Sequence, residues 1–234
     1  MGRLEHLKHT LLENIAVTED LDIEFVLLNY SSPDFCDEWV RTTLEMEIRS
    51  RRLAYYRYDG AVRFHHSHAK NLAHRLARGN IVCNVDADNF IGSGFGCYLA
   101  KEFNSQNGVF LRGGRPNEES GGRIAFLKTD FCKLGGYDES MNSGWGYEDW
   151  DLITRAKLSN LKEVFIYDPT FLKFITHGDS ERVRLSREKI KSDSDNEHRR
   201  ISFLSVTRGK LIANDGSNWG RGRVIKNFEE EIVV

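Results

Sequence analysis

Apolar and polar positions recur along the chain with two periods, one typical of helices and one of short buried strands. Apolar residues at helical spacing predict helices over residues 4–15, 35–50, 68–78, 95–103 and 148–158. Short apolar runs that end in turn-forming residues predict strands over residues 23–28, 53–57, 81–85, 109–112, 124–127, 164–167 and 171–176. We expect Asp34 to cap the second helix and Gly79 to follow the third as its C′ glycine.

The order of these elements predicts an α/β domain. Strands and helices alternate up to about residue 112, which favours a mainly parallel sheet, and the closer spacing of the later strands favours a mixed extension. Residues 178–200 are dense in charges of both signs, which predicts a solvated helix or a loop that closes over a ligand. We expect residues 1–180 to form the main domain and residues 181–234 a helical and loop extension that packs on it.

Composition narrows the class of protein. Lys and Arg number 33 against 35 Asp and Glu, a net charge of −2, which argues against nucleic acid as a partner. The apolar runs are too short to cross a bilayer, and the charged N-terminus lacks the apolar core of a signal peptide, so we expect a cytoplasmic chain. The four cysteines form no CxxC pair, which favours buried thiols over a zinc site or a disulfide framework.

Two carboxylates, Asp86 and Asp88, follow the strand expected at residues 81–85. The carboxyl ends of strands are where α/β sheets bind ligands, and hard oxygen ligands suit Mg²⁺ or Mn²⁺. Such an ion would neutralise a diphosphate. An Asp-x-Asp pair is also common in solvated turns, so the motif alone leaves both interpretations open.

A glycine-rich turn with two tryptophans precedes the helix expected at residues 148–158. It contains Trp145 between Gly144 and Gly146, and then the adjacent acids Glu148 and Asp149. Acids at a helix start complement the helix dipole, which is the structural explanation. An aromatic ring beside a carboxylate is also what a sugar site needs, because the ring stacks on the sugar and the carboxylate accepts a hydroxyl proton. The pattern favours a sugar site.

Histidines supply two further candidates. His177 follows an apolar run and precedes a glycine, where it is either structural or an additional ligand for a metal held by Asp88. His65, His66 and His68 cluster before Lys70. A cation-rich helix start can bind a nucleotide phosphate, and the alternative is a solvated helix N-terminus.

Together these residues resemble the GT-A-fold glycosyltransferases, most closely the β-1,4-galactosyltransferase-like branch, with bacterial family-2 enzymes as near relatives. Five blocks in the same order carry the resemblance, which spans residues 3 to about 180. They look like the family's Arg-x-Glu-His-Leu segment at 3–7, Phe-Asn-Arg-Ala-Lys block at 64–71, Asp-x-Asp motif at 86–88, Gly-Gly to Trp-Gly-Gly-Glu-Asp stretch at 121–149, and metal-histidine segment at 175–177.

The resemblance implies a GT-A fold, which is Rossmann-like with a mainly parallel mixed sheet, and a metal-dependent, inverting transfer. By position, Asp88 and His177 would hold Mn²⁺ or Mg²⁺, and Asp86 would touch the metal or the ribose. Asp149 would be the catalytic base, and Glu148 would hold substrate hydroxyls. The residues implied for substrate are Trp145, Gly122 and Gly146, and those implied for the nucleotide are Arg3, His68, Lys70 and Asp86.

The chain departs from the family pattern in three ways. His68 stands where the family has Arg, which affects base recognition, and Tyr147 replaces a glycine, which narrows the acceptor side. The family's first strand, central in the sheet, precedes the segment that here begins at Arg3. We therefore expect this first strand to be missing through a truncated start. The alternative is that residues 224–225 or 232–234 fill its place, since an empty slot would leave backbone groups unpaired.

The expected function is transfer of a sugar from a nucleotide-diphosphate sugar, with UDP as the expected nucleotide, to a hydroxyl of a glycan or polysaccharide. This role is compatible with peripheral association with a membrane-bound glycan assembly. One alternative is a metal-dependent nucleotidyltransferase, but this activity would not explain why Trp145 lies beside Asp149 in the sequence. The other is a catalytically silent nucleotide- or sugar-binding module. The sequence identifies neither the sugar nor the oligomeric state.

Overall fold

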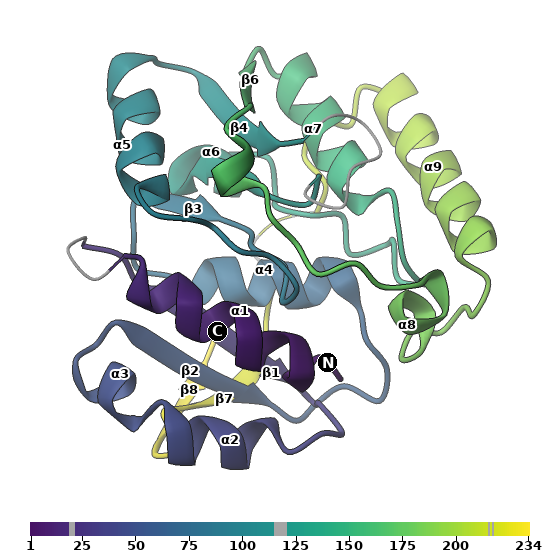
Figure 1. The fold of residues 1–234 in the computed structure, drawn as a ribbon. Helices are drawn as coiled ribbons and strands as arrows, with labels where there is room; N and C mark the ends of the chain where they lie inside the picture. Colours follow the sequence, from purple (N-terminus) through teal and green to yellow (C-terminus); the bar gives the residue numbers. More distant parts are fainter. Residues whose placement is uncertain (19–21, 115–120, 215, 217) are drawn as a thin grey trace.

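The computed structural model of the protein describes residues 1–18, 22–114, 121–214, 216 and 218–234. Across these residues the strands form two four-stranded mixed sheets, ordered β1-β2-β7-β8 and β3-β5-β4-β6. Figure 1 shows the sheets in separate halves of the molecule, with helices α1 and α4 crossing the middle between them. The α/β class with mixed strand directions is as expected, but the single mainly parallel sheet is not: the described strands divide into two.

The first sheet joins the N-terminal strands to the C-terminus. Strand β1 (Phe25–Tyr30) runs parallel to β2 (Leu53–Tyr58), with Phe25 opposite Leu53. Strands β7 (Arg223–Lys226) and β8 (Glu230–Val233) then add to β2 in antiparallel fashion. The two C-terminal runs considered as substitutes for a first strand thus lie beyond β2, on the side away from β1.

The second sheet carries the loops of the candidate site. Strand β5 (Ile124–Leu127) lies antiparallel between β3 (Ile81–Cys83) and β4 (Val109–Gly113), and β6 (Lys162–Ile166) runs parallel to β4. These strands lie within two residues of their predicted limits, because short apolar runs between turn residues mark them clearly.

Helices cover both sheets, and most begin where apolar periodicity begins. In α1 the face formed by Leu4, Leu11 and Ile15 is buried, as the spacing predicts. The described helices are α1 (Leu4–Ala16), α2 (Cys36–Thr43), α3 (Glu45–Arg49), α4 (His66–Leu76), α5 (Phe95–Ser105), α6 (Lys128–Lys133), α7 (Glu148–Leu158), α8 (Asp179–Val183) and α9 (Lys191–Thr207), with a 3-10 turn η1 at Pro169–Phe171.

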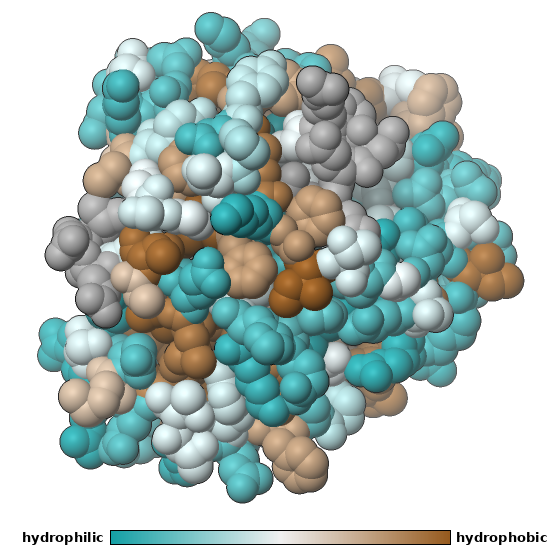
Figure 2. All heavy atoms as spheres, in the orientation of Figure 1, coloured by the Kyte–Doolittle hydropathy of each residue, from teal (hydrophilic) through white to brown (hydrophobic). Residues whose placement is uncertain are grey.

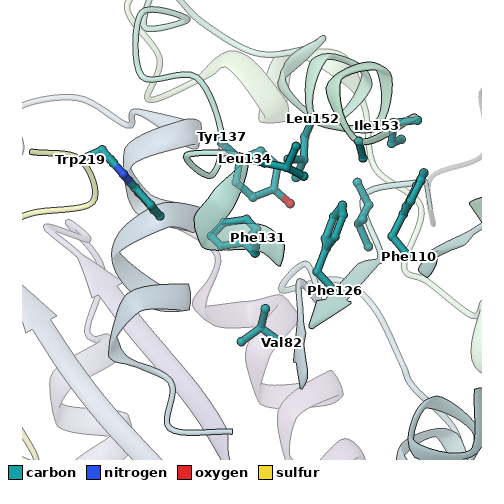
Figure 3. Close-up of a cluster of buried hydrophobic side chains, with 11 residues drawn as sticks. Val82, Phe110, Phe126, Phe131, Leu134, Tyr137, Leu152, Ile153 and Trp219 are labelled. Carbon is teal, nitrogen blue, oxygen red and sulfur yellow. The ribbon is translucent and has the colours of Figure 1, made fainter. Parts of the chain in front are cut away.

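A dense aromatic core supports the second sheet. Phe110 and Phe126 stack with ring centroids 5.2 Å apart, and Phe131 packs edge-on against Tyr137, as Figure 3 shows. All four are at most 1% exposed. Burial of aromatic rings of this size dominates core energetics, so this half of the molecule is a rigid support for the loops above it.

Two capping predictions are wrong. Asp34 does not cap the helix that follows it: its Oδ2 accepts a hydrogen bond from the amide of Leu4 (3.1 Å) and so stabilises the start of α1. The helix predicted over residues 35–50 is instead two helices that meet at Leu44. Gly79 is not a C′ glycine, because α4 ends earlier, at Leu76, and Ala77 is already extended.

Two further predictions need correction. Residues 171–176 form no named strand: the segment begins in the 3-10 turn and pairs only through an isolated bridge between Phe174 and Asn89. The thiols are free, but they are not all buried, since Cys97 and Cys132 are exposed. Among the described residues, no helix has the length and apolar character needed to cross a bilayer.

Candidate active site

A cavity of ≈1890 Å³ lies between the two sheets and extends to the loops that follow β3 and precede α7. Most residues singled out in the sequence line it, although they come from six separate parts of the chain. The lining includes Arg3, Lys70, Asp86, Asp88, Gly122, Trp145, Gly146, Glu148, Asp149 and His177. His68 is not part of the lining.

Asp88 and His177 meet in the wall of this cavity. His177 Nε2 lies 2.5 Å from Asp88 Oδ2, although the residues are 89 positions apart. Main-chain bonds align the two segments, because the amide of Ile175 donates to the carbonyl of Asp88 (2.8 Å) and that of Phe90 to Lys173 (2.9 Å). The short antiparallel contact that replaces the predicted strand therefore brings the imidazole to the carboxylate.

A buried relay fixes the other oxygen of Asp88. Asn89 Nδ2 donates to Asp88 Oδ1 (2.6 Å), and Arg123 Nη2 donates to Asn89 Oδ1 (2.8 Å). Arg123 is fully buried close to Asp86 and Asp88, and burial lowers the pKa of its guanidinium. Outer partners of this kind orient metal ligands. Arg123 and Asn89 were not predicted as site residues, because no local pattern in the sequence distinguishes them.

The residues predicted to bind a metal converge only in part. Across the described residues, no group of three His, Cys, Asp or Glu side chains is arranged to hold an ion. Asp86 makes a different contact: its Oδ1 accepts from Asn84 Nδ2 (3.0 Å), and burial raises the pKa of its carboxyl. Asp88 and His177 remain as a carboxylate and imidazole pair. The carboxylate is a ligand type that Mn²⁺ and Mg²⁺ prefer, the imidazole suits a transition-metal ion better than Mg²⁺, and phosphates and water would have to complete the shell of either ion.

Lys70 joins the two acids at the start of α7. Its Nζ lies 2.8 Å from Asp149 Oδ1 and 3.1 Å from Glu148 Oε1, and all three groups lie in the cavity wall. The acids reach this position because α7 begins directly after Tyr147, which has a left-handed φ of 67°. Lys70 was predicted to bind the nucleotide, and in the structure its ammonium contacts Glu148 and Asp149.

The Lys70 ammonium acts on three carboxylates, those of Asp86, Glu148 and Asp149, and the pKa values of these groups are shifted differently. Burial and the negative charges of Glu148 and Asp86 raise the pKa of Asp149 to about 7, although Lys70 opposes the shift. At Glu148 burial acts to raise the pKa, but the Lys70 ammonium, His66 and a backbone hydrogen bond together lower it to about 2. Asp149 is thus the group whose proton is exchanged near neutral pH, as a general base requires.

Gly122 allows the carboxylates to approach one another. A β-carbon at this position would lie 2.6 Å from Asp86 Oδ2 and 3.4 Å from Asp149 Oδ2. The first distance is too short for any side chain without displacement of Asp86. The glycine therefore keeps open the space between the two acids.

The Trp145 turn is held from behind by helix α9. Ser194 Oγ accepts from the amide of Trp145 (3.2 Å) and donates to its carbonyl (2.7 Å), and His198 Nδ1 lies 2.6 Å from the carbonyl of Gly146. Lys191 Nζ lies 4.4 Å from the centroid of the Trp145 ring. The charged segment predicted to be solvated thus buries Ser194 and His198 against the site.

The remaining nucleotide candidates lie in different environments. Arg3 lines the cavity and pairs with Glu181 of α8 through Nη1 (2.8 Å). His68 is hydrogen-bonded on both ring nitrogens, to the hydroxyl of Tyr30 (2.7 Å) and the carbonyl of Arg221 (2.8 Å). Arg3 is therefore placed to reach a ligand in the cavity, whereas His68 supports its outer wall.

Comparison with known proteins agrees with this architecture. Residues 113–180 match the sequence profile of a family described as the N-terminal domain of galactosyltransferase. This segment contains Gly122, the Trp145 turn, both acids of α7 and His177. No curated protein matches the sequence.

Three solved glycosyltransferases share the fold. The mannosyltransferase PcManGT from Pyrobaculum calidifontis, solved with GDP-mannose and Mn²⁺, superposes with a TM-score of 0.57 at 19% identity over 70% of this chain. TarS residues 1–349 from S. aureus superpose with a TM-score of 0.55 at 15% identity over 71% of this chain. The catalytic domain of Drosophila β1,4-galactosyltransferase 7, solved with xylobiose, superposes with a TM-score of 0.51 at 13% identity over 83% of this chain.

The fraction of each relative's own length that this chain spans differs. The chain spans 51% of the mannosyltransferase and 56% of TarS, but 82% of the Drosophila domain. The chain thus shares the α/β fold of these GT-A structures, and its galactosyltransferase-like segment contains part of the candidate site.

Proposed function

We propose that this chain is a metal-dependent, inverting glycosyltransferase that moves a sugar from a nucleotide-diphosphate sugar to a hydroxyl of a glycan or polysaccharide. The observation that carries the proposal is that the Asp88–His177 pair and Asp149 line one cavity. UDP is the proposed nucleotide, and GDP is the nucleotide of the Pyrobaculum relative. Mn²⁺ or Mg²⁺ held by Asp88 and His177 would stabilise the departing diphosphate as a Lewis acid.

Asp149 is the proposed base. Its Oδ1 is held by Lys70, and its Oδ2 lies on the Gly122 side, where it can accept the proton of the acceptor hydroxyl. Loss of that proton makes the acceptor oxygen a nucleophile toward the anomeric carbon, and attack opposite to the diphosphate inverts an α-linked donor to a β-glycoside. Glu148 keeps Lys70 in place, and Trp145 supplies an aromatic wall for the sugar.

Nucleotide contacts complete the proposal. Arg3 and Asp86 line the cavity near the Asp88–His177 pair and are assigned to the phosphates and ribose. Lys70 is assigned to positioning Asp149, since it is already bonded to both acids. Four points stay predictions. They are a role for His68 at the nucleotide base, a domain boundary near residue 180, a first strand that precedes Arg3 in the GT-A pattern, and a peripheral membrane association.

The first test is thermal denaturation with UDP or GDP, each with and without Mn²⁺. A ligand that binds only the folded state raises the melting temperature by mass action. We expect a shift that requires Mn²⁺ and is lost in Asp88→Ala, whereas Asp59→Ala, an exposed acid remote from the cavity, retains it. A shift independent of Mn²⁺, or unaffected by Asp88→Ala, would contradict the metal assignment.

The second test measures turnover without an acceptor. Slow release of UDP from a UDP-sugar supports a transferase, because water then replaces the acceptor hydroxyl. Release of pyrophosphate from a nucleoside triphosphate would instead support a nucleotidyltransferase. Metal-dependent nucleotide binding without either reaction would support a silent binding module.

A further inference from the structure

Helix α9 packs with polar residues inward and leaves apolar residues outside. Its buried residues are Ser194, His198 and Ser202, which recur every four positions and so share one helical face. Phe203 and Leu204, by contrast, are 65% and 38% exposed. Figure 1 shows α9 at the edge of the molecule, on the outer side of α7, and Figure 2 shows apolar atoms among hydrophilic ones along that edge. The polarity of this helix is the reverse of what packing on a core favours.

Hydrogen bonds to the candidate site, rather than apolar burial, hold the inner face of α9. His198 Nε2 lies 2.8 Å from Ser143 Oγ, and its Nδ1 lies 2.6 Å from the carbonyl of Gly146. Ser194 Oγ donates to the carbonyl of Trp145 at 2.7 Å. These bonds fix the rotation of the helix about its axis. The fold therefore imposes the outward direction of the opposite face.

That opposite face combines apolar side chains with cations. Arg200 precedes Phe203 and Leu204 by three and four positions, so the three side chains are neighbours on the helix surface. Arg208 follows Leu204 by four positions, at the C-cap. All four residues are exposed, and together they make up what we call the α9 outer face.

Charge is segregated along this part of the chain. Residues 191–197 hold three acids and one Lys, whereas residues 198–214 hold four Lys or Arg and no Asp or Glu. The whole chain has a net charge of −2, so the second half of α9 is a local positive surface on a slightly negative protein. A cation at a helix C-terminus complements the dipole, which accounts for Arg208 but not for Arg200 in the middle of the helix. The segregation favours a partner with negative charge.

The arrangement suits a lipid surface better than a protein surface. The centre of a protein interface is depleted of charge, and a guanidinium buried there needs a partner of its own. On α9 the guanidinium of Arg200 lies one turn from both apolar residues, so a protein that covered Phe203 and Leu204 would bury it as well. At a membrane interface, apolar side chains enter the acyl boundary while Arg keeps its charged group among the phosphates.

We propose that the α9 outer face docks on a membrane surface that contains anionic lipids. Phe203 and Leu204 enter the boundary between head groups and acyl chains, and Arg200 and Arg208 bind lipid phosphates. The helix lies along the interface and does not cross the bilayer. Because its inner face holds the Trp145 turn, docking brings the candidate site close to acceptors carried by the membrane; this consequence alone rests on the proposed function.

Vesicle sedimentation of the full chain tests the charge of the partner. The vesicles are phosphatidylcholine alone or an equal mixture of phosphatidylcholine and phosphatidylglycerol. We expect binding only to the mixture, and the binding should weaken at about 1 M NaCl, where the Debye length is about 3 Å. One cation near an anionic surface strengthens binding about fivefold, so Arg200→Gln combined with Arg208→Gln should lower the partition coefficient about 25-fold.

Substitutions of Phe203 test the apolar contact. Phe203→Ser should lower the partition coefficient, whereas Phe35→Ser, at an aromatic residue that is 78% exposed before α2, should leave it unchanged. Phe203→Trp should gain fluorescence that lipids with brominated acyl chains quench, and Phe35→Trp should gain fluorescence that they do not quench. Both positions are exposed, so the variants should fold, and their melting temperatures check this.

The other outcomes count against the proposal. No binding to the mixture, or equal binding to neutral vesicles, would remove an anionic membrane as the partner. Binding that survives the double Arg substitution or Phe203→Ser would remove the α9 outer face as the docking surface. A dimer that forms without lipid and is lost in Phe203→Ser would replace the membrane with a second copy. No nucleotide enters these measurements, so failure of the proposed function is recorded separately.

Discussion

The two halves of the molecule differ in how completely their strands and polar groups are paired. In the β3-β5-β4-β6 half, an aromatic core supports loops whose side chains are fixed by the Arg123–Asn89–Asp88 relay and by Lys70. In the β1-β2-β7-β8 half, the inner edge is open and its apolar residues are partly exposed. The difference teaches that the candidate site is built mainly on the more densely packed half, while the other half ends in a strand with one unpaired edge among the described strands.

The largest expected effect tests the chemistry of the rigid half. Asp149→Asn should lower turnover about 10²–10⁴-fold, because the amide cannot accept the acceptor proton. Nucleotide and metal binding should be retained, since neither Asp88 nor His177 is touched. The measurement is UDP release together with the thermal shift. Near-normal turnover would remove Asp149 as the base, and Asp130→Asn on α6 serves as the matched control.

Stability should reveal the contrast between the halves directly. Phe126→Ala should lower the free energy of unfolding by about 3–5 kcal/mol, because the ring is 1% exposed in a packed core. Leu28→Ala, on the open edge, should cost only about 1 kcal/mol. Urea denaturation of both variants measures the difference. Equal losses would mean that the edge of β1 is packed as tightly as the aromatic core.

The relay behind Asp88 gives the next prediction. Asn89→Ala removes the donor to Asp88 Oδ1 and leaves Arg123 without that partner, so Mn²⁺ affinity should fall about 10–100-fold. Titration calorimetry with Mn²⁺ in the presence of UDP measures this loss. Asn104→Ala, an exposed residue of α5, is the control. An unchanged affinity would place the metal away from Asp88.

The smallest expected effect is a displaced pH profile. The pKa of Asp149 is about 7, and Lys70 holds it below the value that burial alone would give. In Lys70→Met the acid limb of kcat/KM should therefore move to higher pH by about 1 unit or more, whereas Lys70→Arg should restore it. A limb that stays in place would show that Lys70 does not act on the base.

The same carboxyl makes stability depend on pH. Its pKa is raised in the folded state, so its contribution to stability is complete below about pH 4 and is lost as the pH rises through 7. Glu148, with a pKa of about 2, titrates below this window. Asp149→Asn should therefore flatten the decline of the melting temperature between pH 4 and 7.

Sequence reasoning succeeded where local pattern alone decides. Helix α7 begins at Glu148 and ends at Leu158 as predicted, because a glycine turn, acids in the first turn and apolar spacing all agree. Strand β5 also matches its prediction at Ile124–Leu127. Both elements are marked by features within a few residues of their ends.

It failed where the partner lies far along the chain. Asp34 looks like a cap for its own helix, but the amide that it accepts from belongs to Leu4, 30 residues earlier. No local pattern indicates that Lys70 contacts Glu148 and Asp149, which lie 78 and 79 positions away. The charged segment of α9 gave no sign that Ser194 and His198 bind the Trp145 turn.

The sequence by itself determined the α/β class, the order of the elements and the acids, tryptophan and histidine of the candidate site, since these follow from local spacing and residue chemistry. Only the tertiary structure decided that Asp88 meets His177, that Lys70 is bonded to Asp149, and that the described strands form two sheets. Such pairings depend on which buried polar groups satisfy one another across the fold, and no local period encodes that choice.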